Sequence, residues 1–209
     1  DYVSVVPGTH DAYVPGAFKM LSERWRPFML GDDRPASTEG SDLFPFLRQR
    51  GNTALIGVST AHATPPFMAN GLFDRLQALR LERILDQAAA DRLFRVIMIH
   101  HPPVRGAAPW HKRLFGIGRF AEVLADHGAE LVLHGHTHLD TLHWLPGKSG
   151  TVPVVGVPSA SEGLGGHRPP SGYNMLTIDG NPGAWTCRLD RHGLDVTGAG
   201  FELKSTEKL

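Results

Sequence analysis

The chain has 209 residues, of which 41% are hydrophobic and 20% charged, as is typical of a globular domain with one buried core. Its 21 basic and 21 acidic residues cancel, which argues against a nucleic-acid-binding patch or a surface for acidic membranes. No apolar run reaches the roughly 18 residues that a membrane span needs, and a single cysteine, Cys187, excludes an internal disulfide. We therefore expect one cytoplasmic domain over residues 1–209, with no membrane span; the composition leaves its oligomeric state open.

The first two thirds of the chain alternate between apolar runs and amphipathic stretches. Residues 73–90 have apolar side chains near helical spacing with charges between them, which predicts a helix. The apolar run 95–99 lies between polar residues and predicts a buried strand. In chain order we expect strand 2–6, helix 16–25, a polar loop over 31–40, strands 44–48 and 54–59, helix 73–90, strand 95–99, helix 117–127 and strand 130–133.

The chain changes character after residue 140. Short alternating segments are separated by glycine, proline and asparagine, a pattern typical of antiparallel strands. We expect these strands over 142–145, 152–157, 175–178, 185–190 and 194–197. Alternating strands and helices followed by a β-rich end predict a layered α/β domain.

Three polar clusters each follow the end of a predicted buried strand, at residues 9–11, 100–101 and 134–138. In a layered α/β protein the carboxyl ends of such strands meet at one crevice. Neutral imidazole is a good ligand for zinc, iron, manganese and nickel. The alternative for a lone His-x-His is a surface loop, but a second histidine pair after another strand favours a metal site.

The pair His10-Asp11 is ambiguous by itself. A histidine followed by an aspartate is usually a polar turn. Beside a metal centre, the same pair provides an acid with an orienting carboxylate.

The motifs Gly8-Thr9-His10-Asp11, His100-His101-Pro102-Pro103 and Gly135-His136-Thr137-His138 resemble, in this order, the last three motifs of the calcineurin-like metallophosphoesterases. The His-His-Pro-Pro motif resembles the corresponding motif of the bacterial phosphodiesterase branch. The resemblance implies a layered α/β/β/α sandwich and two divalent ions (Mn, Fe, Zn or Ni). It also implies hydrolysis of a phosphodiester or phosphomonoester in a small phosphorylated substrate, by a hydroxide that bridges the ions.

The resemblance also implies roles by motif position. His100 and His136 would bind one ion, and His138 and Thr9 the other. His10 would act on the leaving group, held by Asp11. The site residues expected in this way are the metal ligands Thr9, His100, His136 and His138, the catalytic residues His10 and Asp11, and the substrate-binding residue His101.

The sequence departs from the family pattern in two respects. Thr9 stands where the family has an asparagine whose carbonyl oxygen binds the second ion, and a neutral hydroxyl is a poorer ligand. The family's first two motifs, D-x-H and G-D-x-x-D, have no counterpart before Val5. We therefore expect the N-terminal part of the sandwich to be missing from this chain and its metal site to be incomplete.

Two alternatives follow from these departures. One is a non-catalytic or truncated remnant of the same fold. The other is a metallo-β-lactamase-like hydrolase, because residues 136–140 read H-x-H-x-D. The latter family expects a further histidine where this chain has Thr141.

Overall fold

A computed structural model describes residues 3–33 and 43–209 of the chain. The helices are η1 (Thr9–Asp11, a 3-10 turn), α1 (Ala17–Met29), α2 (Arg75–Ala90) and α3 (Ile117–His127). The strands are β1 (Phe46–Arg50), β2 (Thr53–Val58), β3 (Gly71–Leu72), β4 (Phe94–Ile99), β5 (Leu114–Phe115), β6 (Leu131–His134), β7 (Thr141–Gly147), β8 (Gly150–Gly156), β9 (Gly172–Asn181), β10 (Ala184–Leu194) and β11 (Phe201–Lys208). No helix among these residues is long and apolar enough to cross a membrane.

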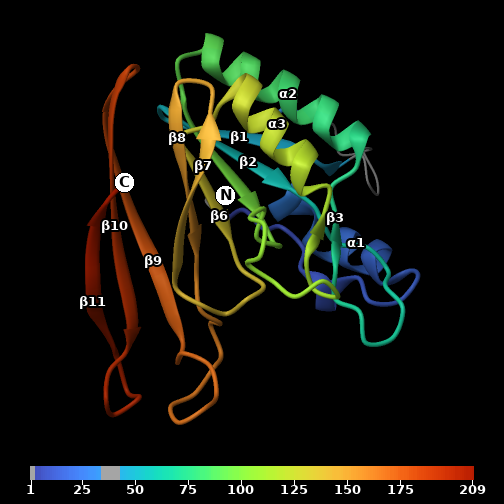
Figure 1. Cartoon of the computed structure of the whole chain (residues 1–209), viewed down its shortest axis with the longest axis vertical. Coiled ribbons are helices and arrows are strands. Elements are labelled where there is room, and N and C mark those ends of the chain that lie inside the picture. Colours follow the sequence, from blue (N-terminus) through green and yellow to red (C-terminus); the bar gives the residue numbers. More distant parts are fainter. Residues whose placement is uncertain (1–2, 34–42) are drawn as a thin grey trace.

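The strands form two main sheets. The larger has six strands in the order β1-β2-β4-β6-β8-β7, and the smaller has three in the order β11-β10-β9. Strands β2, β4, β6 and β8 are parallel, whereas β1, β7 and the whole second sheet pair antiparallel. Helices α2 and α3 cover one face of the large sheet and the small sheet lies against the other (Figure 1). The mixed, layered α/β fold predicted from the sequence is confirmed.

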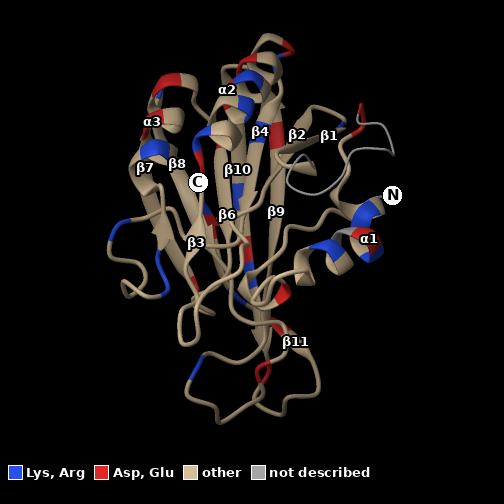
Figure 2. Ribbon diagram, turned by 90° about the vertical axis from the view of Figure 1, so that its right-hand side faces the viewer, with Lys and Arg blue, Asp and Glu red and all other residues tan. Residues whose placement is uncertain are grey.

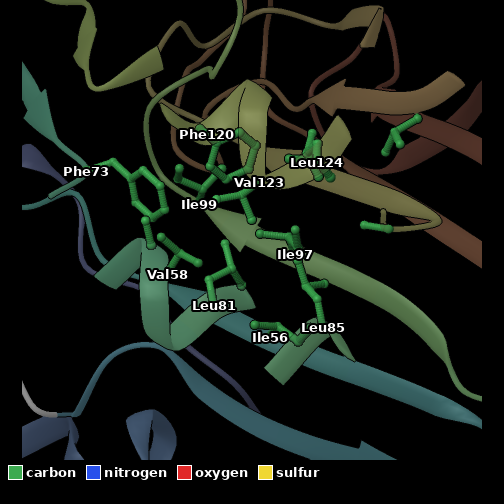
Figure 3. Close-up of a cluster of buried hydrophobic side chains, with 14 of the residues drawn as sticks. Ile56, Val58, Phe73, Leu81, Leu85, Ile97, Ile99, Phe120, Val123 and Leu124 are labelled. Carbon is green, nitrogen blue, oxygen red and sulfur yellow. The ribbon is translucent and has the colours of Figure 1, made fainter. Parts of the chain in front are cut away.

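Strand β4 shows why the large sheet needs a cover on both faces. Its alternate side chains Ile97 and Ile99 are buried in the cluster under α2 and α3 (Figure 3). Phe94 and Val96 point to the other face and pack against Cys187 and Leu189 of the second sheet, among others. A strand buried on both faces reads as a continuous apolar run, which is how β4 appears in the sequence.

Two strands expected from the sequence, near the start and near the end of the chain, were wrong. No strand forms within residues 3–6; instead the Val5 N–H donates to the Phe28 carbonyl near the end of α1, at 3.0 Å. The guanidinium of Arg48 donates to the Val3 carbonyl. This segment therefore bonds to the backbone of α1 and to the Arg48 side chain of β1, and pairs with no neighbouring strand among the described residues. The strand expected over 194–197 is the end of β10 and a turn, and β11 was not predicted.

Other boundaries differ by a few residues. Helix α1 continues to Met29, with Pro27 inside it, and β9 and β10 extend beyond the segments expected for them. The polar loop expected over 31–40 lies mostly outside the described residues. The fourth layer implied by the resemblance, a helix layer over the second sheet, is not formed by residues 3–33 and 43–209.

Candidate functional site

The predicted polar clusters meet at the carboxyl edge of the large sheet. β4 ends at Ile99 and leads into His100, while the adjacent parallel strand β6 leads into Gly135 and His136. The Gly135 N–H donates to the His100 carbonyl at 3.1 Å, so the sheet pairing continues into the motif residues. Parallel pairing thus brings together side chains that are 36 residues apart in sequence.

His100 and His136 present ring nitrogens to each other. His100 Nε2 lies 3.2 Å from His136 Nδ1, and Thr9 Oγ1 lies 3.4 Å from the same His136 nitrogen. His136 Nε2 donates to the Lys112 carbonyl at 2.8 Å, which assigns the ring proton to Nε2 and leaves a lone pair on Nδ1. A backbone carbonyl that fixes the outer ring nitrogen is the usual support of a metal-binding histidine.

Both rings are neutral at physiological pH. Burial, together with the neighbouring His136, lowers the pKa of His100 to about 3. Burial likewise lowers the pKa of His136 to about 4, although its bond to the Lys112 carbonyl opposes the shift. Neutral imidazole is the form that binds a metal ion.

His101 lies beneath the site and is fully buried. Its Nε2 donates to the Ala69 carbonyl at 3.1 Å, and its Nδ1 accepts from the Thr60 hydroxyl at 2.7 Å. Burial lowers the pKa of His101 to about 2. Because both ring nitrogens are engaged and the ring does not reach the surface, this placement supports neither the substrate contact expected for His101 nor a role as metal ligand.

His134 and Asp140 are also neighbours rather than ligands. His134 Nδ1 donates to the Gly135 carbonyl at 3.1 Å, and the Thr141 hydroxyl donates to its Nε2 at 3.3 Å. Asp140 accepts from Arg191 Nη1 at 3.0 Å, on the second sheet. Asp140 therefore serves as an ion-pair partner, which argues against the H-x-H-x-D alternative.

A pocket of about 370 Å³ opens above these histidines. Its lining includes the motif residues Thr9, His10, Asp11, His100, His136 and His138. The structure therefore brings six of the seven expected site residues to one pocket, and leaves His101 below it.

Asp11 does not hold His10 in the way the resemblance implied. Its Oδ2 accepts from the Gly8 N–H at 2.8 Å and so closes the η1 turn. The exposed ring of His10 packs against Tyr13 instead, with centroids 5.0 Å apart. Asp11 thus fixes the backbone that carries His10, and leaves the imidazole itself free to turn toward the pocket.

The histidine turn carries backbone strain. His136 and His138 adopt φ of 65° and 58°, a left-handed conformation that costs a non-glycine residue roughly 1–2 kcal/mol. Strained residues that the surrounding structure holds in place cluster at functional sites. Within the described residues, only Phe67 and Arg92 share this feature among non-glycine positions.

The residues at the pocket offer some of the ligands that a metal ion needs. Among the described histidines, cysteines and acidic residues, one group of three or more lies close enough to hold an ion: His100, His101 and His136, whose ligand atoms are all within 4.8 Å of one another. Both ring nitrogens of His101 have hydrogen-bond partners, which favours His100, His136 and the Thr9 hydroxyl as the ligands, although Thr9 Oγ1 also lies 3.2 Å from His101 Nε2. These three residues would surround one ion with neutral ligands and no carboxylate. His138 lines the same pocket but does not belong to this group.

Two charged lining residues were not selected from the sequence. Lys112 and Arg168 belong to loops without a readable motif, yet both line the pocket. No periodicity or spacing distinguishes them from other surface cations, so only the fold could identify them.

The comparisons with known proteins agree with the motifs. The family model described as calcineurin-like phosphoesterase matches residues 1–140, which is about two thirds of the chain and includes every motif named above. The chain therefore belongs to the calcineurin-like phosphoesterase family. No curated protein matches it significantly.

Among solved structures, the chain is similar to a single mutant of Vps29 from Entamoeba histolytica. The match has 12% sequence identity and a TM-score of 0.32, and it covers 99% of this chain and 82% of that one. A similarity this low carries no argument about function.

Proposed function

We propose that the chain is a metal-dependent phosphohydrolase whose active site is the pocket over β4 and β6. The observation that carries the proposal is the facing pair His100 Nε2 and His136 Nδ1, 3.2 Å apart, both neutral and both opening on the same pocket. Family membership supports the reaction class. The substrate is a phosphodiester or phosphomonoester of a small molecule, and the chain acts in the cytoplasm.

The proposed ligands of the first ion are His100 and His136. The Lys112 carbonyl fixes the tautomer of His136, and the backbone bond from Gly135 to His100 holds the two rings in register. Thr9 and His138 contribute to a second ion, with manganese, iron, zinc and nickel as candidates. Bound ions would polarise the phosphoester oxygens and lower the pKa of water.

His10 is the proposed proton donor to the leaving group. Its ring is exposed at the pocket and is attached to a turn that Asp11 closes. An imidazole at the pocket can donate a proton to a leaving oxygen. Tyr13, beside the ring, limits the directions in which it can turn.

The sequence motif His-His-Pro-Pro favours the bacterial phosphodiesterase branch of the family. This finer assignment rests on resemblance in sequence. It predicts activity on diesters, and the two ester classes can be compared directly with p-nitrophenyl phosphate and bis(p-nitrophenyl) phosphate.

The test combines metal binding with turnover. Chelator-treated protein is titrated calorimetrically with Mn²⁺ and Zn²⁺, and hydrolysis of both nitrophenyl esters is then measured. We expect one or more ions to bind and to stimulate hydrolysis, and the double variant His100→Asn/His136→Asn to lose both. The control is His127→Asn, at the end of α3. Wild-type protein that binds no divalent ion, or a double variant that binds like the wild type, would contradict the proposal.

A non-catalytic role is the second candidate. It is favoured by one observation: the described residues offer the ion no carboxylate ligand. The same experiment distinguishes the hydrolytic role from the non-catalytic role, because a non-catalytic protein would bind the ion and hydrolyse neither ester.

A further inference from the structure

Two cationic residues from loops outside the family motifs line the pocket. Lys112 lies on the loop between β4 and β5, and Arg168 on the loop between β8 and β9. Among the described residues that line the pocket, the one carboxylate is that of Asp11, which already accepts a hydrogen bond from Gly8. With neutral rings at His100 and His136, the lining carries a net positive charge even without an ion.

Both cations are tied to the histidine turn. The Lys112 carbonyl accepts from His136 Nε2 at 2.8 Å, and Arg168 Nη1 donates to the Thr137 carbonyl at 2.6 Å. The backbone of Lys112 and the guanidinium of Arg168 are therefore fixed relative to the metal-binding histidines. A guanidinium has five N–H donors, and the bond to Thr137 uses one of them.

The remaining donors are available to a ligand. No ion pair joins Lys112 or Arg168 to a carboxylate within residues 3–33 and 43–209. Cations that face a pocket without acidic partners favour an anion there, and the arginine fork matches the oxygens of a phosphate.

We propose that Lys112 and Arg168 form an anion subsite that selects a terminal, doubly charged phosphate group over a phosphodiester. The physical reason is charge: a phosphate monoester carries about −1.5 to −2 at neutral pH, whereas a diester carries a single charge and offers fewer free oxygens. This inference rests on the proposed function for the hydrolytic step, and it favours the monoester, against the diester activity that the His-His-Pro-Pro motif predicts.

The test measures binding of inorganic phosphate by calorimetry, with a chelator present and at low ionic strength. The variants are Lys112→Gln and Arg168→Gln. Arg105→Gln is the matched control, because Arg105 is exposed on the same loop as Lys112 and does not line the pocket. We expect each pocket variant to weaken phosphate binding about tenfold, the usual effect of one charged hydrogen bond, and the control to bind like the wild type. Dimethyl phosphate, a diester monoanion, should bind more weakly than phosphate.

Arg168 also donates to the Thr137 carbonyl, so its replacement by glutamine could weaken phosphate binding by disturbing the histidine turn. A further variant, Arg168→Lys, keeps the positive charge and distinguishes a direct contact with phosphate from this structural effect. Retention of most of the phosphate binding supports a direct contact. A loss as large as that of Arg168→Gln, or equal binding by all variants, overturns the subsite, as does equal affinity for dimethyl phosphate.

These outcomes are independent of hydrolysis. If phosphate binds through both cations but no divalent ion stimulates turnover, the hydrolytic proposal fails and the subsite stands. If Mn²⁺ stimulates turnover of both esters and Lys112→Gln leaves their ratio unchanged, the subsite fails and the hydrolytic proposal stands.

Discussion

At the scale of single residues, hydrogen-bond partners distinguish histidines that look alike in the sequence. His100 and His101 are adjacent, yet one opens on the pocket and the other has both ring nitrogens occupied below it. His134 and His136 differ in the same way. A ligand needs a free lone pair, and that property depends on the partner of the second ring nitrogen.

The strained turn makes a prediction at this scale. Replacing His138 by glycine removes the steric cost of its φ of 58°, which outweighs the entropy that glycine adds to the unfolded chain. We expect His138→Gly to raise the free energy of unfolding by about 0.5–1 kcal/mol, while binding of the second ion and hydrolysis decline. Urea denaturation and metal titration measure the two effects. A variant that loses stability and keeps full activity would show that His138 has a structural role only.

At the scale of elements, short pieces of structure hold the buried histidine in place. Strands β3 and β5 form a two-residue ladder, and β3 begins at Gly71, beside the His101 ring. A Cβ added to Gly71 would lie 2.3 Å from His101 Nδ1. No side chain fits there, so glycine at this position is required by close approach.

Gly71→Ala should therefore displace the His101 ring and its bond to Thr60. We expect a loss of about 1–3 kcal/mol in unfolding free energy, as for other overpacked cores, with weaker metal binding at the neighbouring His100. Gly163→Ala is the matched control, because an added Cβ there meets nothing within 4 Å. Equal urea midpoints for the two variants would contradict the packing argument.

Arg191 joins the second sheet to the first. From β10, its guanidinium donates to Asp140 at 3.0 Å, to Glu207 at 2.8 Å and to the carbonyls of Gly156 and Thr141, each at 3.0 Å. Asp140 follows the histidine turn, so this contact also anchors the end of the site. The side chain itself is buried.

Loss of this contact should destabilise the whole domain. We expect Arg191→Met to cost about 2–3 kcal/mol, because it leaves buried carbonyls and two carboxylates without their donor. Arg188→Met, on the same strand but with an exposed side chain, should cost less than about 1 kcal/mol. Thermal unfolding of both variants provides the comparison, and similar melting temperatures would exclude a structural role for Arg191.

At the scale of the whole molecule, charge is balanced while the interior is rich in neutral histidine. Positively and negatively charged residues are interspersed along α1, α2 and α3 (Figure 2). Burial lowers the pKa of four of the described histidines: to about 3 for His100, about 2 for His101 and about 4 for His134 and His136. An unfolded histidine has a pKa of about 6.5.

The metal-free protein should consequently be acid-sensitive. Because the folded pKa values lie below the unfolded one, the stabilisation is complete above pH about 6.5 and declines as pH falls toward 4. Each histidine contributes a slope of up to about 1.4 kcal/mol per pH unit. Urea denaturation with a chelator from pH 7.5 to 4.5 measures the slope, and His134→Gln should reduce it. A stability that does not change over this range would contradict the burial of these rings.

The sequence by itself determined the alternating elements and the family. Apolar runs fixed the strands β2, β4 and β6, since such runs must be buried, and helix α3 was predicted with its observed bounds. Two of the three motifs follow β4 and β6 directly, so their convergence was predictable from parallel pairing. The first motif, over residues 8–11, follows the segment 3–6, which is not a strand. The extended segment 3–6 was mistaken for a strand because its backbone partners are α1 and Arg48, which periodicity does not reveal.

Tertiary structure decided the chemistry of the site. Three features depend on partners from other loops. They are the occupied nitrogens of His101, the His136 Nδ1 that faces His100, and the positions of Lys112 and Arg168 at the pocket. Contacts between residues that are distant in the chain arise only when the loops close around the sheet, and no local spacing encodes them. Sequence therefore identified which residue types could bind a metal and a phosphate, and the fold determined which of them face the pocket.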